Sequence, residues 1–478
     1  MEKKQINTFL KIFPLAFILV GVLIGTVHYG ISIEFLLILD TVICCIIAFA
    51  AGYKWEEMEK AFVKKIADTW LGVLILILIG AIVGTWIYSG AVPMLIYYGI
   101  KWINPSFIPF TAFVVTAFVA IFTGTSWGAA ATSGVAFIGV AHATGVPLPL
   151  IAGAIISGAY VGDKNSPISD TTVLSAMGSG AQLIDHIKSM LIVTIPSVII
   201  SSIIFIALGF TASSNIDIST VKETKEILDS LDSMFNFNIL LLLPAVVVFV
   251  GSFKGLSPII TMFLGSFLAL ILGAIFQDFG FLNSIKAFVS GFNVSMSNLP
   301  ADQIPANLNN LLNRGGMVNM MPTVLFLITA LTFGSMLQLI GTLQTILDLL
   351  LKVIKGVKSL MIVTWFTTLV VNSSVNSTQF TFLTLGPIFQ DIYKKYKLHP
   401  SALSRTMEEG GTLTEPIVPW TVTGVYMAST LGVATLQYLP YSFFNLVSIV
   451  VMFIYILTFP KLKFAVPVLK EEKDNNNN

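Results

Sequence analysis

Long stretches without charge constrain this chain more than any other feature. The longest run without Asp, Glu, Lys or Arg extends from Trp102 to Gly162, and others cover 315–347, 359–390 and 416–460. Each exceeds the ~20 apolar residues that cross a bilayer as a helix, and backbone groups in lipid must bond within their own segment. The composition agrees, since 11% of the residues are charged against about 25% in a soluble domain. The sequence therefore predicts an all-α polytopic membrane protein.

Charge, cysteine content and motifs exclude several other classes. The net charge of +1 gives no electric field that would favour nucleic acid. The apolar runs make the lipid bilayer the expected partner. Cys44 and Cys45 are adjacent in an apolar stretch, which disfavours a disulfide framework and a thiolate metal site. Gly124–Gly128 fits the G-x-S-x-G pattern of serine hydrolases, but no strand-to-helix context surrounds it. The phosphate-binding G-x-x-x-x-G-K-[ST] motif does not occur, so we expect neither an enzyme nor a cofactor.

Two segments, 107–142 and 360–393, differ from simple spans. Each has two apolar arms, shorter than the ~20 residues that cross a bilayer, around a polar cluster. Such segments are predicted to be re-entrant hairpins with polar tips near mid-membrane. The tips are Gly124-Thr125-Ser126-Trp127-Gly128 and Asn372-Ser373-Ser374-Val375-Asn376-Ser377-Thr378.

The two halves of the chain resemble each other at a constant spacing. Pro167 and Pro416 differ by 249 in residue number, as do the tip residues Gly124 and Ser373. The predicted organisation is a first transmembrane repeat over 1–212, a polar linker over 213–235, and a second repeat over 236–478 with a short C-terminal tail. Each repeat is expected to contain about five transmembrane helices, one re-entrant hairpin and a discontinuous helix.

Lysine-rich loops indicate the orientation of the repeats, because Lys and Arg mark cytoplasmic loops. The loop at 53–68 holds four lysines and its counterpart at 277–295 holds one. Around the hairpins the bias reverses, since 352–358 holds three lysines and its counterpart holds Lys101 alone. The repeats are therefore predicted to be inverted. Ten full spans, the first retained after the basic start of the chain, then place both termini in the cytoplasm.

The first break in the helical pattern is Gly162–Thr172. Pro167 removes a backbone donor and interrupts the helix, which frees carbonyl groups. Asp163 and Asp170 add charge to oxygens that can replace the hydration shell of Na⁺. Lys164 is either a counter-ion for a substrate or the partner of one of these carboxylates. The neutral oxygens predicted to complete the site are those of Thr125, Ser126, Asn165, Ser166 and Thr171.

The second break is Glu408–Thr421. Glu415 takes the place of Ser166 at the spacing of 249 and precedes a charge-free run, and an ionisable residue inside a membrane is a functional candidate. Glu408 and Glu409 fit a solvated or Arg405-paired helix face as well as a transport role. By pseudo-symmetry, the residues expected to face the first break are Ser373, Asn376, Thr378 and Glu415.

These motifs resemble the NhaC-type Na⁺/H⁺ antiporters of the ion transporter superfamily. The residues that carry the resemblance are Gly124–Gly128, Gly162–Thr172, Glu409–Thr412, Pro416–Trp420 and Gly424–Ala428. The resemblance implies a secondary antiporter of the bacterial cytoplasmic (inner) membrane that exchanges Na⁺ for H⁺. The family also includes malate/lactate antiporters and members proposed to carry amino acids, so a small organic acid stays open as substrate. This chain departs from the family pattern at Gly410, where a serine is usual.

Competition at a carboxylate is the mechanism that we favour from the sequence. A buried carboxyl group binds either Na⁺ or a proton, so each ion displaces the other. Asp163 and Asp170 are the expected exchanging pair. The alternative is an organic-acid or amino-acid transporter, and a channel fits the two breaks less well. The oligomeric state, a homodimer included, stays open.

Overall fold

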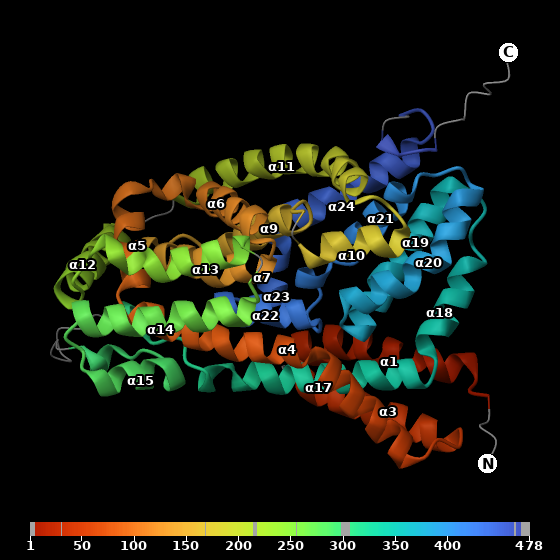
Figure 1. Ribbon diagram of the computed structural model, residues 1–478, viewed down its shortest axis with the longest axis horizontal. Coiled ribbons are helices and arrows are strands. Elements are labelled where there is room, and N and C mark those ends of the chain that lie inside the picture. The colour runs from red at the N-terminus through yellow and green to blue at the C-terminus, as the bar shows by residue number, and fades with distance from the viewer. Residues whose placement is uncertain are drawn as a thin grey trace.

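The computed structural model describes residues 5–29, 31–167, 169–213, 218–254, 256–297, 306–462 and 465–469 (Figure 1). Within these ranges the chain folds into helices, with one isolated antiparallel bridge between Leu398 and Val468. The predicted all-α class is confirmed.

The helices fall into two series along the chain. The first comprises α1 (Thr8–Val20), α2 (Val27–Tyr29), α3 (Ile33–Ala50), α4 (Trp55–Tyr88), α5 (Ala91–Trp102), α6 (Ile108–Thr123), α7 (Ser126–Ala129), α8 (Val135–Thr144), α9 (Leu148–Asp163), α10 (Asp170–Ser179), α11 (Leu183–Ser213) and α12 (Ile218–Met234). The second comprises α13 (Leu243–Phe253), α14 (Pro258–Phe276), α15 (Phe281–Ser290), α16 (Ala306–Leu312), α17 (Met321–Leu339), α18 (Thr342–Leu351), α19 (Val357–Val375), α20 (Thr378–Lys395), α21 (Pro400–Gly410), α22 (Val422–Leu431), α23 (Thr435–Tyr438) and α24 (Phe443–Thr458).

Several of these helices are long and apolar enough to cross a membrane. Among the described residues five qualify alone, and up to eight spans result if three bent helix pairs are each counted once. Leu148–Asp163 and other apolar helices are shorter than this limit. The protein is therefore a multi-pass membrane protein, and the number of ten full spans stays a prediction.

Figure 1 shows the arrangement of the helices. α11 runs along one long edge of the molecule and α3 lies at the opposite edge, with α4 and α17 packed together beside it. The short helices around the two breaks, among them α7, α9, α10 and α22, lie between these layers. This position encloses the breaks in protein.

The described helices that were not expected from hydropathy include α5 and α12. α5 precedes the first hairpin and meets the next helix at a bend of 113°. α12 occupies most of the predicted linker, and its buried residues Ile227 and Leu231 belong to the main apolar core. This side of α12 packs against α5 and α8, so the charged residues of 213–235 belong largely to an amphipathic helix.

Both predicted hairpins have their turns inside the predicted tips. α6 ends at Gly124, whose φ of 67° favours glycine, and Thr125 then caps α7. In the second hairpin Asn376 adopts the same left-handed conformation at 54°, and Ser377 caps α20. Asparagine is the residue other than glycine that most readily takes this conformation.

The spacing between equivalent elements changes at the hairpins. The helices that enter them begin at Ile108 and Val357, which differ by the expected 249, but α6 has 16 residues and α19 has 19. Beyond the tips the spacing is therefore 252. It relates the helix caps Thr125 and Ser377, Ser169 and Thr421, and Gly180 and Gly432. Asp163 is thus the counterpart of Glu415, and the predicted match of Glu415 with Ser166 is corrected by three residues.

Each break packs against the hairpin of the other half. α10, which follows the first break, lies against α20 and α21. α22, which follows the second break, contacts the first hairpin, where the Tyr426 ring stacks on Trp127 at 4.0 Å between ring centroids. The Tyr426 hydroxyl also donates to the Trp127 carbonyl at 2.6 Å. This crossed packing brings the two breaks together.

Candidate functional site

Asp163 lies at the centre of the first break. It is the last residue of α9, it is buried, and Ser169 Oγ donates to its Oδ1 at 2.7 Å. Thr172 Oγ1 donates to its backbone carbonyl at 3.0 Å, a group that the end of the helix leaves free. The break therefore presents a buried carboxyl group together with hydroxyl oxygens.

The other predicted groups of the first break divide into two sets. Thr171 Oγ1 lies 3.0 Å from Ser169 Oγ and so belongs to the surroundings of Asp163. Asn165 Nδ2 donates to the Val161 carbonyl at 2.7 Å, and Ser166 Oγ donates to the Ile121 carbonyl at 2.7 Å. Asn165 and Ser166 thus hold the shape of the break.

Asp170 differs from Asp163 in its exposure. It begins α10, and its side chain is exposed. Its Oδ2 accepts from Gln379 Nε2 at 3.3 Å, and its Oδ1 accepts from the Thr171 backbone N–H at 3.0 Å. A carboxylate on the first turn is favoured by the helix dipole. Asp170 therefore carries its charge at the open side of the break, beside the second hairpin.

The first hairpin tip approaches Asp163 from another side. Ser126 is buried, and its hydroxyl interacts with the Asp163 carboxyl and with the Tyr160 hydroxyl. Thr125 accepts from the Gly128 N–H at 3.4 Å, which makes it a helix cap. Of the two predicted tip ligands, Ser126 lies in the site and Thr125 shapes the tip.

Glu415 is the corresponding carboxyl group of the second break. It accepts from Asn372 Nδ2 at 2.8 Å, from Thr423 Oγ1 at 3.0 Å and from Thr378 Oγ1. Ser373 Oγ donates to the Leu369 carbonyl at 2.6 Å. Of the residues predicted for the second break, Thr378 and Glu415 are therefore brought together, whereas Ser373 bonds within α19.

Asn376 also has a structural role. Its Oδ1 accepts from the Val422 N–H at 3.0 Å, which ties the second tip to the start of α22.

Across the two breaks the charges of Asp170 and Glu415 act on Asp163, and the charge of Asp170 acts on Glu415. The three predicted acidic residues therefore form one electrostatic cluster.

Lys164 is engaged in an ion pair between the two halves. Its Nζ lies 2.6 Å from Glu409 Oε1 and donates to Ser448 Oγ at 2.9 Å, and both charged side chains are fully buried. The ammonium also lies 4.8 Å from the centre of the Phe444 ring. The predicted pairing of Lys164 with Asp163 or Asp170 is wrong.

Glu408 and Glu409 are the functional candidates that sequence reasoning placed least well. Both are fully buried, so a solvated helix face is wrong. Arg405 donates to the carbonyls of Ser189 and Ala465 at 3.3 and 2.7 Å. The sequence signal for their burial was the neighbouring Gly410, because a glycine in a helix can allow another backbone to approach closely. In the structure an added Cβ at Gly410 would lie 2.5 Å from the Trp365 carbonyl.

The described residues contain no group of three or more His, Cys, Asp or Glu side chains suited to a bound metal ion. Na⁺ enters the argument as a transported ion, for which carboxyl, hydroxyl and carbonyl oxygens are the appropriate ligands.

A multi-pass helical protein with buried carboxyl groups at two breaks is a membrane transporter in its architecture. The Na⁺/H⁺ antiporter family matches residues 5–190 and 179–458 of the sequence. The chain belongs to this family. It is a secondary transporter and not an enzyme.

Three relatives illustrate the range of the family. A Haemophilus influenzae protein named as an uncharacterized Na⁺/H⁺ antiporter is 39% identical over 92% of this chain and 94% of its own length. The malate-2H⁺/Na⁺-lactate antiporter of Bacillus subtilis is 36% identical over 91% of each chain. The Na⁺/H⁺ antiporter NhaC of Bacillus subtilis is 32% identical over 91% of this chain and 96% of its own.

Proposed function

We propose that this protein exchanges Na⁺ for H⁺ across the bacterial cytoplasmic membrane by competition at Asp163 and Asp170. The observation that carries the proposal is the buried Asp163 carboxyl at the end of α9, beside Ser169 and Ser126. A carboxylate removed from water needs a positive partner, and either a proton or Na⁺ supplies it. One ion leaves when the other binds, which is the requirement for exchange.

Asp170 complements Asp163 in this proposal. Its exposed carboxylate lies close enough to act on the buried one. A cation that arrives from water meets Asp170 before it loses its hydration shell to Asp163, Ser126 and Thr171. We assign Asp163 to the inner position of the site and Asp170 to its mouth.

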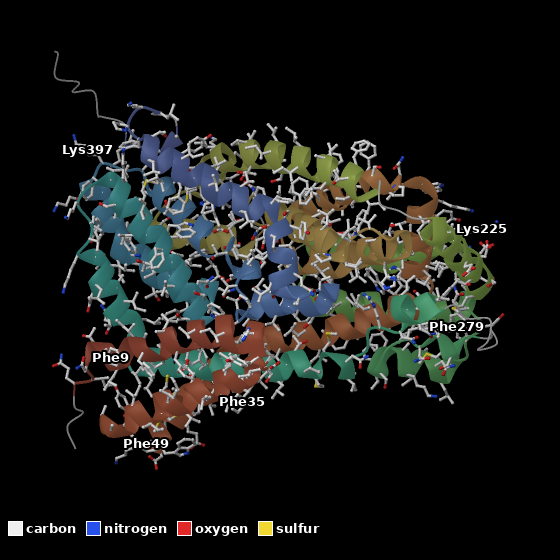
Figure 2. All side chains as sticks on the ribbon, turned by 180° about the vertical axis from the view of Figure 1, so that it is seen from behind. Phe9, Phe35, Phe49, Lys225, Phe279 and Lys397 are labelled. Atoms are coloured by element: carbon white, nitrogen blue, oxygen red, sulfur yellow. The ribbon has the colours of Figure 1, made fainter. Side chains whose placement is uncertain are left out.

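The proposed membrane orientation has both termini in the cytoplasm and the repeats inverted. Figure 2 shows Phe9, Phe49 and Lys397 at one end of the molecule, and Lys225 and Phe279 at the other. Phe49 precedes the lysine-rich segment 53–68, which was predicted to be a loop but forms the start of α4 from Trp55 onward, whereas Phe279 lies in its lysine-poor counterpart. This separation supports the proposal that equivalent loops face opposite sides.

Transport of a small organic acid is the second candidate, because one relative is named as a malate and lactate antiporter. A carboxylate substrate needs a cationic partner. Lys164 was the expected one, but its ammonium is bound by Glu409 and Ser448. This observation favours exchange of the inorganic cations.

Proteoliposomes that contain a pH-sensitive dye test the proposal. Na⁺ added outside should drive proton movement, and Asp163→Asn and Asp170→Asn should each abolish it, because an amide exchanges neither Na⁺ nor a proton. K⁺, malate and lactate serve as comparison solutes. Na⁺-driven exchange at the wild-type rate in Asp163→Asn would remove that residue from the mechanism, and proton movement that requires malate would favour the second candidate.

A further inference from the structure

Glu408 is a buried carboxyl group that the proposed exchange mechanism does not use. Its side chain is fully buried, and neither Oε1 nor Oε2 has a hydrogen-bond partner. Its neighbour Glu409 is satisfied by Lys164 and Ser448. A carboxyl group without partners inside a protein costs several kcal/mol unless something binds it. The Glu408 carboxylate therefore needs a proton or a bound cation to compensate its charge.

The surroundings of Glu408 contain further oxygens. Thr412 Oγ1, one helical turn later in the chain, is also buried without a hydrogen-bond partner. The hydroxyls of Thr412 and Thr171 lie near the Glu408 carboxyl, and the charge of Asp163 acts on it. Glu408 and Thr412 come from the second half of the chain, whereas Thr171 and Asp163 come from the first. The unpartnered side chains of Glu408 and Thr412 thus lie beside oxygen-bearing side chains of the first break.

The charges around this position allow a cation to bind. The groups that act on Glu408 are Asp163 and Lys164, and Lys164 is neutralised by Glu409 at 2.6 Å. Arg405 lies on α21, the same helix as Glu408. His186 lies on α11, and its ring forms a hydrogen bond with Ser404 of α21. The pair Lys164–Glu409 has no net charge, and the two carboxylates of Glu408 and Asp163 outnumber the single guanidinium of Arg405, so net negative charge is left to be balanced.

Asp40 shows why an unpartnered carboxyl group alone is not sufficient. It is also fully buried with both oxygens unpartnered. Its surroundings on α3 are apolar residues such as Leu36 and Leu37, with Cys44 beside it. No second unpartnered hydroxyl belongs to that helix interface among the described residues. Among the described residues, Glu408 thus differs from Asp40 in having carboxyl and hydroxyl oxygens from both halves beside it.

We propose that Glu408 and Thr412, facing Thr171 and Asp163, form a second site for a monovalent hard cation, with Na⁺ as the ligand. Carboxylate and hydroxyl oxygens are the ligand types that a hard cation prefers. The site deepens the proposed function and rests on it, since it adds a second Na⁺ to a transporter that already binds one at Asp163 and Asp170. It also joins the two halves, because its oxygens come from both.

Equilibrium binding of ²²Na⁺ to the purified full-length protein in detergent tests the second site. Wild-type protein should bind two Na⁺ per chain at saturation, and Glu408→Gln should bind one. Asp40→Asn is the matched control, since it removes an equally buried and unpartnered carboxyl group elsewhere, and it should still bind two. Two Na⁺ bound by Glu408→Gln would overturn the inference.

A second variant keeps the test independent of folding. Thr412→Val preserves the carboxyl group and the volume of the side chain but removes one hydroxyl oxygen, so the affinity of one of the two sites should fall about tenfold. Unchanged binding curves for both Thr412→Val and Glu408→Gln would refute the site.

The same measurement separates the two proposals. Asp170→Asn should also lose one Na⁺, because Asp170 belongs to the site of exchange and not to the site at Glu408. If Asp170→Asn binds as the wild type does while Glu408→Gln loses one ion, the proposed function fails and the site at Glu408 stands. If only Asp170→Asn loses an ion, the second site fails and the proposed function stands.

Discussion

The ion pair between Lys164 and Glu409 gives the most quantitative prediction. The two side chains are fully buried and 2.6 Å apart, and Ser448 Oγ lies 2.9 Å from both Lys164 Nζ and Glu409 Oε2. Removal of one partner leaves a buried charge whose remaining hydrogen-bond partner among the described residues is Ser448. Glu409→Leu and Lys164→Met should each lower the free energy of unfolding by about 3–5 kcal/mol.

The double variant should behave differently from the sum of the single ones. Lys164→Met with Glu409→Leu leaves no unpaired charge, and replacing a buried pair by apolar residues is often neutral. We therefore expect a loss of no more than about 2 kcal/mol, so the coupling energy is at least about 4 kcal/mol. Reversible unfolding by SDS in mixed micelles measures each free energy. Additive losses in the double variant would refute the reasoning, because they would mean that the two charges do not depend on each other.

Two further predictions concern packing and orientation. Gly178→Ala should destabilise the protein by about 1–3 kcal/mol, because a Cβ there would lie 2.4 Å from the Phe382 carbonyl, whereas Gly356→Ala, with no atom within 4 Å, should not. Thermal unfolding in detergent compares them, and equal midpoints would contradict the close packing of α10 on α20. Single cysteines in 53–68 and 352–358 should be labelled only from the cytoplasmic side and one at Lys225 only from outside, and labelling of 352–358 from outside would exclude the inverted topology.

The helical class and the position of the breaks were predictable because they depend on composition and on local backbone chemistry. Charge-free runs force helices in a membrane, and polar clusters between short apolar arms predicted turns that the structure places at Gly124 and Asn376. Clustering of Asp163, Asp170 and Glu415 followed from the resemblance between the halves. These features depend on short segments of the sequence and can therefore be predicted from it.

The register of the repeats and the partners of the charged residues were not predictable. α19 is three residues longer than α6, so the two helices begin at the expected spacing of 249 but end at a spacing of 252, and hydropathy does not show where each helix ends. Lys164 and Glu409 are 245 residues apart, and their pairing depends on the crossed packing of the two halves. The roles of Asn165 and Ser166 likewise depend on the backbone carbonyls of Val161 and Ile121, to which their side chains donate.

The two halves share a backbone plan, but their buried charges differ. At the spacing of 252, Glu409 corresponds to Ser157 and Lys164 to Pro416, so the ion pair has no counterpart on the other side of the pseudo-symmetry. With the two repeats that we propose, alternating access is expected to move one repeat against the other. An ion pair that joins the repeats stabilises the arrangement in which its partners touch, and a bias of a few kcal/mol decides which arrangement is populated. We therefore expect Lys164 and Glu409 to set the resting state of the protein, and ion binding at the neighbouring Asp163 to act against that bias.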